Sequence, residues 1–149
     1  MSVDNVEVFA IPDSLTERIN SALASGLPML LAYVNAAGQA RLSFRGSIYQ
    51  YSPDQLALWI RDPEGGLLTA LPANPKLTLL YRDPAARTTV TFYGRGRVET
   101  DPTAATAIYD AIPEQEQKAD PERKGRALIV DLDQIQGRTA DGPLNLKRG

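Results

Sequence analysis

Arginine and glycine come together in one segment of the chain, RDPEGGLLTALPANPK, which begins at Arg61. Arg61 follows a run of alternating apolar residues, and Gly65-Gly66 precedes a short apolar stretch that predicts a helix. Arginine is a bidentate partner for phosphate oxygens, and glycines let a phosphate approach the unpaired N–H groups of a helix start. The segment is therefore a candidate site for a phosphorylated molecule. The alternative is an ordinary turn, in which Arg61 pairs with a nearby carboxylate and the glycines serve only backbone geometry.

A second candidate is the strand-like sequence SFRGS. Because side chains alternate across a strand, Ser43, Arg45 and Ser47 should project to one side, and Phe44 and Gly46 to the other. Two hydroxyls and a guanidinium beside a glycine suit the edge of a polar, planar ligand. The alternative is the solvated outer face of a half-exposed strand.

The residue types that are missing narrow the chemistry further. The sequence has no cysteine, which excludes disulfides, thiolate nucleophiles and cysteine-ligated metals. It has no histidine either, which removes the base of Ser-His-Asp catalysis and the commonest transition-metal ligand. No metal site is expected, and any catalysis is expected to depend on a cofactor that supplies the reactive group.

The distribution of charge argues against nucleic-acid binding. The formal net charge is -2, from 16 basic and 18 acidic residues. Arginines make the middle of the chain basic, and acidic residues near both ends offset them. Such a balance favours a local anion site over a surface that binds a duplex.

The elements that would position these candidates are mostly strands. Apolar alternation predicts six of them, over residues 28–35, 39–51, 56–61, 77–81, 88–99 and 126–133. Helices are predicted at a capping box that begins at Ser14, over 65–73, and from Asp101. Gly94 and Gly96 on the apolar face of one strand allow the tight curling that closes a small barrel. Six mostly antiparallel strands with few helices therefore predict a small β-barrel.

The length of 149 residues is that of one domain, expected over residues 1–149. No apolar run is long enough to span a bilayer, and the first residues lack the basic region of a secretory signal. A soluble, cytoplasmic protein is the expectation. Residues 1–12 and 137–149 are expected to be flexible termini. The second of these carries three glycines and lacks periodicity, so it is either mobile or taken by a partner subunit.

The order of these features resembles the flavin-binding split-barrel family, the superfamily of pyridoxamine 5'-phosphate oxidase and its FMN-binding relatives. The likeness covers roughly residues 27–135. It rests on the turn at Gly38 with its following strand, on Asn74-Pro75 after a short helix, and on the closing GRGRV. The resemblance implies a mainly β protein: a six-stranded antiparallel split β-barrel with a few flanking helices. It also implies a homodimer with two FMN sites between its subunits.

The same resemblance implies which residues contact the cofactor. The SFRGS segment would run beside the isoalloxazine ring and ribityl chain, and the pair at 60–61 would contact the flavin at a strand end. Positions 65–67 would take the place of the oxidases' basic phosphate cluster, and Thr89 would make a polar contact to the ring. The full implied set is Ser43, Phe44, Arg45, Gly46, Ser47, Ile60, Arg61, Gly65, Gly66, Leu67 and Thr89.

Some departures separate this chain from the true oxidases. Gly-Gly-Leu replaces the basic phosphate cluster and Ser43 stands where the oxidase has arginine, so Arg45 and Arg61 would have to restore the positive charge. The C-terminal Trp and Arg motif that the oxidases use on their substrate has no counterpart here, so oxidation of pyridoxamine phosphate is not expected.

The function predicted from the resemblance is an FMN-binding oxidoreductase that acts on a small molecule. One alternative is a non-catalytic module that binds or stores a flavin or the deazaflavin F420. Another is a dimeric scaffold whose site has decayed, which the missing basic cluster would also explain.

Overall fold

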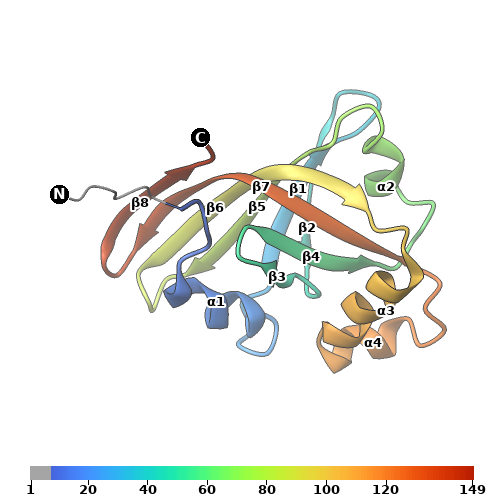
Figure 1. The fold of residues 1–149 in the computed structure, drawn as a ribbon, viewed down its shortest axis with the longest axis horizontal. Helices are drawn as coiled ribbons and strands as arrows, with labels where there is room; N and C mark the ends of the chain where they lie inside the picture. The colour runs from blue at the N-terminus through green and yellow to red at the C-terminus, as the bar shows by residue number, and fades with distance from the viewer. Residues whose placement is uncertain (1–7) are drawn as a thin grey trace.

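The protein is built around one twisted antiparallel sheet with short helices on its outside (Figure 1). The structure, a computed structural model, describes residues 8–149. In this part of the chain the strands are β1 (Met29–Val34), β2 (Ala40–Arg45), β3 (Tyr49–Ser52), β4 (Gln55–Ile60), β5 (Lys76–Asp83), β6 (Thr88–Val98), β7 (Arg126–Thr139) and β8 (Gly142–Lys147). The helices are α1 (Asp13–Asn20), α2 (Gly66–Ala70), α3 (Pro102–Ala111) and α4 (Glu114–Ala119). None of these helices is both long and apolar enough to cross a membrane.

Strand β7 joins the two halves of the sheet. The strand order is β2-β1-β5-β6-β7-β4-β3, and β8 pairs with β7 off this path. At 14 residues β7 is long enough to pair with β4 and β8 as well as β6. Figure 1 shows it crossing the middle of the molecule beside β6.

The core lies on the inner face of the sheet, where alternate residues of each strand point. On β6, Val90 and Phe92 are buried, whereas Tyr93 and Arg95 are exposed, as their alternation predicted. Helix α1 adds Leu15 and other apolar residues to this core. A second, smaller cluster lies beneath α3 and consists of Ala57, Trp59, Ile108, Tyr109, Ile112, Ala127 and Ile129.

The predicted strand over residues 39–51 is wrong, because the chain leaves one edge of the sheet there and joins the other. Strand β2 pairs with β1 and ends at Arg45, while β3 begins at Tyr49 and pairs with β4. Between them Ser47 turns inward. Its hydroxyl accepts the N–H of Trp59 at 3.0 Å and donates to the carbonyl of the same residue at 3.2 Å.

The C-terminal segment predicted to be flexible, 137–149, is instead folded against its own chain. Its strand β8 pairs with β7 from Gly142 opposite Thr139 to Lys147 opposite Gln134. Within residues 8–149 the sheet has eight strands where six were predicted, because β8 is added and residues 39–51 form two strands. Only two apolar residues, Leu144 and Leu146, alternate with polar ones in β8, and two are too few to predict a strand.

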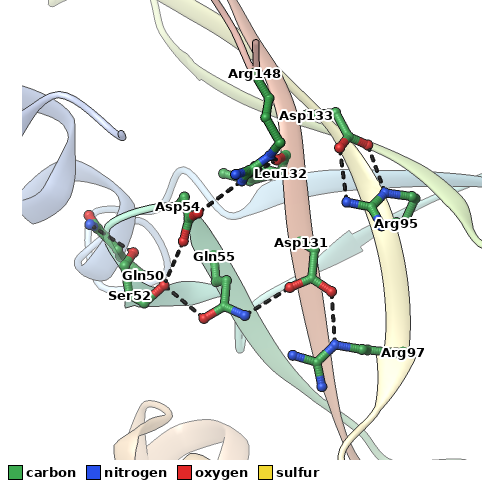
Figure 2. Close-up of polar contacts among 10 residues, drawn as sticks. All are labelled: Gln50, Ser52, Asp54, Gln55, Arg95, Arg97, Asp131, Leu132, Asp133 and Arg148. Atoms are coloured by element: carbon green, nitrogen blue, oxygen red, sulfur yellow. Dashed lines mark hydrogen bonds and ion pairs between the residues drawn. The ribbon is translucent and has the colours of Figure 1, made fainter. Parts of the chain in front are cut away.

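Arg148 fixes the end of this segment. Its guanidinium donates to the carbonyl of Leu132 at 2.8 and 3.0 Å and to the carboxylate of Asp54 at 2.9 Å. Figure 2 shows these contacts beside a row of outward-facing ion pairs on β6 and β7. The guanidinium also lies 4.8 Å from the centre of the Phe9 ring. Arg148 thus connects β7 with the β3–β4 turn and the N-terminal segment.

Of the N-terminal segment predicted to be flexible, residues 1–7 lie outside the described residues. The remainder is anchored, because Ile11 is buried and donates its N–H to the carbonyl of Pro53 at 2.7 Å. The predicted capping box at Ser14 is wrong. Pro12 takes the position before the helix and offers no side-chain hydrogen bond, so Ser14 falls inside the first turn.

Candidate functional site

A hollow of about 720 Å³ brings together six of the eleven predicted site residues. These are Arg45, Ile60, Arg61, Gly65, Gly66 and Leu67. Tyr33 of β1, Asp62, Pro63, Ala119 and Lys124 complete the lining. Strands β2 and β4 lie in opposite halves of the strand order, so hydrogen bonding along the sheet does not make them neighbours. The curling of the sheet brings their ends together, as a barrel requires.

Strand β2 directs Ser43 and Arg45 toward the inside of the sheet. In register they stand opposite Leu31 and Met29, both of which are buried. Within residues 8–149, Ser43 Oγ and Arg45 Nε are buried without a hydrogen-bond partner. Arg45 lines the hollow and Ser43 does not. Buried polar groups are nearly always paired in folded proteins, so the unpaired Arg45 Nε marks a place where a polar ligand would complete the structure.

The hollow carries an excess of positive charge. Arg45, Arg61 and Lys124 line it together with one carboxylate, that of Asp62. Among the ion pairs within residues 8–149, none includes Arg45 or Arg61, so the carboxylate partner that the ordinary-turn alternative gave Arg61 is not observed. The turn itself forms, because Asp62 accepts the backbone N–H groups of Glu64 at 3.0 Å and Gly65 at 3.2 Å. Burial lowers the pKa of Arg45 and the guanidinium of Arg61 lowers it further, whereas Tyr33 and, more weakly, the carboxylate of Glu116 raise it. An anion between the two guanidinium groups would relieve their repulsion.

The glycines at the start of α2 allow close packing in the wall of the hollow. A Cβ on Gly66 would lie 2.6 Å from the Tyr33 hydroxyl, so glycine lets Tyr33 pack against the helix. The N–H of Gly65 donates to the carbonyl of Asp62 at 3.2 Å and is therefore already used. Because α2 has only five residues, its dipole is small. The arginine side chains, more than the helix start, make the hollow attractive to an anion.

Ser47 and Gly46 do not line this hollow. The Ser47 side chain is 1% exposed, and both of its hydrogen bonds go to the backbone of Trp59, so it has a structural role. Gly46 packs against Leu23 and Glu116, whose side chains lie 3.1 and 3.3 Å from where a Cβ would be.

Phe44 and Thr89 also lie elsewhere within one chain. Phe44 is 68% exposed and faces the outside of the sheet opposite Leu30. Thr89, at the start of β6, is exposed and lines other hollows with residues of β7 such as Gly137. Neither residue lines the hollow of Arg45 and Arg61 within a single copy of the chain.

Tyr33 and Lys124 belong to the hollow and were not predicted. Tyr33 sits near the end of β1, where an alternating aromatic residue is equally typical of a core position. Lys124 lies in the loop that joins α4 to β7. The basic pair directly before Gly125 and the last long strand is the one sequence signal that indicates it.

Comparison with known proteins supports the fold. No protein-family model matches this sequence, and no curated protein does. Solved structures match most of its length. A general stress protein 26-related protein of the pyridoxinephosphate oxidase family from Clostridium acetobutylicum superposes with a TM-score of 0.67 at 12% identity, over 92% of this chain and 96% of that one.

Two further structures give the same result. An FMN-binding protein from Syntrophomonas wolfei has a TM-score of 0.62 at 12% identity, covering 91% of this chain and 89% of its own. A NimC/NimA family protein from Clostridium acetobutylicum has a TM-score of 0.65 at 11% identity, covering 93% and 100%. This chain therefore has the split-barrel fold of the pyridoxamine 5'-phosphate oxidase-like proteins, as the sequence resemblance predicted.

Proposed function

We propose that this protein is a cytoplasmic, FMN-binding oxidoreductase of the pyridoxamine 5'-phosphate oxidase-like group that acts on a small molecule. The observation that carries the proposal is the meeting of Arg45 and Arg61 in one hollow, neither in an ion pair with any described residue. A phosphate dianion supplies the partner that both guanidinium groups lack. The FMN-binding protein from Syntrophomonas wolfei has the same fold, which supports a flavin as the ligand.

The lining fits a phosphorylated, partly planar cofactor. Arg45 and Arg61 would hold its phosphate. The unpaired Ser43 hydroxyl, on the same face of β2 as Arg45 though outside the hollow, would bond a polar edge of the ligand. Ile60 and Leu67, almost completely buried, give the hollow an apolar wall that excludes water. A bound flavin would supply hydride or electron transfer, and the residues of this chain would bind and orient it.

The proposal includes a homodimer with cofactor at the interface. The outer face of β1, β2 and β5 exposes apolar side chains, with Leu42 66% and Phe44 68% exposed. Contiguous exposed apolar residues mark interaction surfaces on soluble proteins. Thr89 would reach the flavin only if a second copy contributed it, because in one chain it lines other hollows. A protein that sediments only as a ~16 kDa species at micromolar concentration would overturn this part of the proposal.

Titration with FMN and riboflavin tests the phosphate site. We expect Arg45→Gln and Arg61→Gln each to weaken FMN binding about 10- to 100-fold, the worth of one hydrogen bond to a charged group. Riboflavin, which lacks the phosphate, should bind the variants nearly as it binds the native protein. Arg18→Gln, on α1 and outside the hollow, is the matched control. The proposal fails if the native protein binds neither ligand, or if both arginine variants bind FMN as tightly as it does.

A second candidate function is binding of a flavin or deazaflavin without turnover. It is favoured by the scarcity of acid–base groups in the hollow, where the one carboxylate, Asp62, already accepts the backbone N–H of Glu64 at 3.0 Å. Reduced nicotinamide added without oxygen separates the two functions. Bleaching of the bound flavin supports the oxidoreductase, whereas an unchanged visible spectrum supports the binding module.

A further inference from the structure

The loop over residues 120–125 is held by one buried carboxylate. Asp120 is 8% exposed, and its Oδ2 accepts the indole N–H of Trp59 at 2.8 Å and the backbone N–H of Gly125 at 2.9 Å. Its Oδ1 accepts the backbone N–H of Lys124 at 3.0 Å. Burial by itself raises the pKa of Asp120, but these three hydrogen bonds together outweigh it and leave the pKa lowered. The carboxylate is therefore a charged anchor for the loop.

Gly125 brings this loop directly against the end of β4. A Cβ at this position would collide with the carbonyl oxygen of Ile60 and with Trp59 Nε1, so no other residue allows the same approach. Ile60 lines the hollow described above, and Arg61 follows it in the chain. The loop consequently places Lys124 on the same hollow, on an element that neither arginine belongs to.

We propose that Lys124 is a third phosphate-binding cation of the hollow, and that Asp120 is the positioning residue that holds it there. The inference rests on the proposed function and assigns a residue that the family resemblance does not supply. Positions 65–67 carry no charge, so a cation from another element would replace the missing basic cluster.

The ion pair of Lys124 with Glu122 does not prevent Lys124 from binding a phosphate. Its ammonium lies 3.2 Å from the carboxylate of Glu122, but the two side chains are 74% and 72% exposed. An ion pair in water of this kind contributes little, so a phosphate dianion at the hollow would compete with it successfully.

Lys124→Gln tests the inference with two ligands. Its FMN affinity should fall about 3- to 10-fold, while its riboflavin affinity should stay within about twofold of the native value, because only FMN carries the phosphate. Added salt should weaken FMN binding less in the variant than in the native protein. Lys118→Gln is the control: this lysine is equally exposed, pairs with Glu114 on α4 and lies outside the hollow.

Asp120→Asn tests the positioning role by a double-mutant cycle. If Asp120 acts through Lys124, the variant should lose FMN affinity but little riboflavin affinity, and combining it with Lys124→Gln should add little further loss. Additive losses, or equal losses for FMN and riboflavin, would show a general structural role and overturn the positioning of Lys124.

The possible failures are distinguishable. Native protein that binds FMN, with Lys124→Gln binding it equally well, overturns the assignment of Lys124 and leaves the proposed function standing. Native protein that binds neither FMN nor riboflavin overturns the proposed function, and the assignment of Lys124 falls with it.

Discussion

Replacing Asp120 by asparagine removes the charge that holds the α4–β7 loop, and we expect it to lower the free energy of unfolding by about 2–4 kcal/mol. Both carboxylate oxygens are used, one by Trp59 and Gly125 and the other by Lys124. Asparagine keeps one oxygen and turns an NH₂ group toward N–H donors. At least one charge-assisted bond is lost, about 1.5–3 kcal/mol, and a buried donor is left unpaired, which adds about 1 kcal/mol or more.

Urea unfolding measures this loss. The chain has one tryptophan, Trp59, whose indole donates to Asp120, so its emission reports directly on the affected contact. Far-UV circular dichroism, followed in parallel, checks that the transition is two-state. The control is Asp110→Asn, which breaks the exposed ion pair with Arg123 and should cost less than about 1 kcal/mol.

The dependence on pH sharpens the prediction. The folded pKa of Asp120 lies below its ordinary value of 3.8, so its charge stabilises the fold above that pH. This contribution is lost as the pH falls through the folded pKa. The stability gap between native protein and Asp120→Asn should therefore hold from pH 7 to 5 and narrow below about pH 4. A gap under 0.5 kcal/mol at pH 7, or one that widens on acidification, would refute the reasoning.

Three further predictions concern stability. Ser47→Ala should cost about 1–3 kcal/mol in urea unfolding, because the backbone of Trp59 loses its hydroxyl partner; a smaller loss would contradict the structural role of Ser47. Gly66→Ala should change stability in urea unfolding by less than about 1 kcal/mol, because displacement of the Tyr33 hydroxyl offsets the gain of alanine in a helix; adding Tyr33→Phe should raise the stability of Gly66→Ala, and no gain would refute the contact. Arg148→Ala should speed amide hydrogen exchange in β8 by about 10-fold or more. Unchanged exchange would show that β8 stays paired with β7 without the contacts of Arg148 to Asp54 and Leu132.

The strands with regular alternation could be predicted from the sequence. From Val90 to Val98 each second residue of β6 is apolar or glycine, and Val90 and Phe92 are buried as this pattern predicts. Strand β8 could not be predicted, because only Leu144 and Leu146 mark it and its stability comes from pairing with β7. The break between β2 and β3 was missed for a related reason: it depends on which sheet edge each strand finds, a property of the tertiary fold.

Site residues that are indicated by their neighbours in sequence could be predicted. Those that reach the hollow only because the sheet curls could not. Arg61 was singled out by its own neighbours in sequence, and the structure places Arg45 in the same hollow. Lys124 gave only a weak signal, because a lysine before a strand is common and its significance depends on the loop folding against β4. Contact between Thr89 and the cofactor stays a prediction, and it requires a second copy of the chain to contribute Thr89.

The position of β7 in the chain has a consequence for biosynthesis. This strand closes the ladder on β4 and β6, yet it follows them by tens of residues. While the polypeptide emerges from the ribosome, one edge of β4 and one edge of β6 stay unpaired until β7 has been synthesised. Non-local pairing of this kind slows folding and exposes nascent chains to association. We therefore expect the yield of native protein to depend on translation speed and chaperone supply more strongly than for a helical protein of equal length.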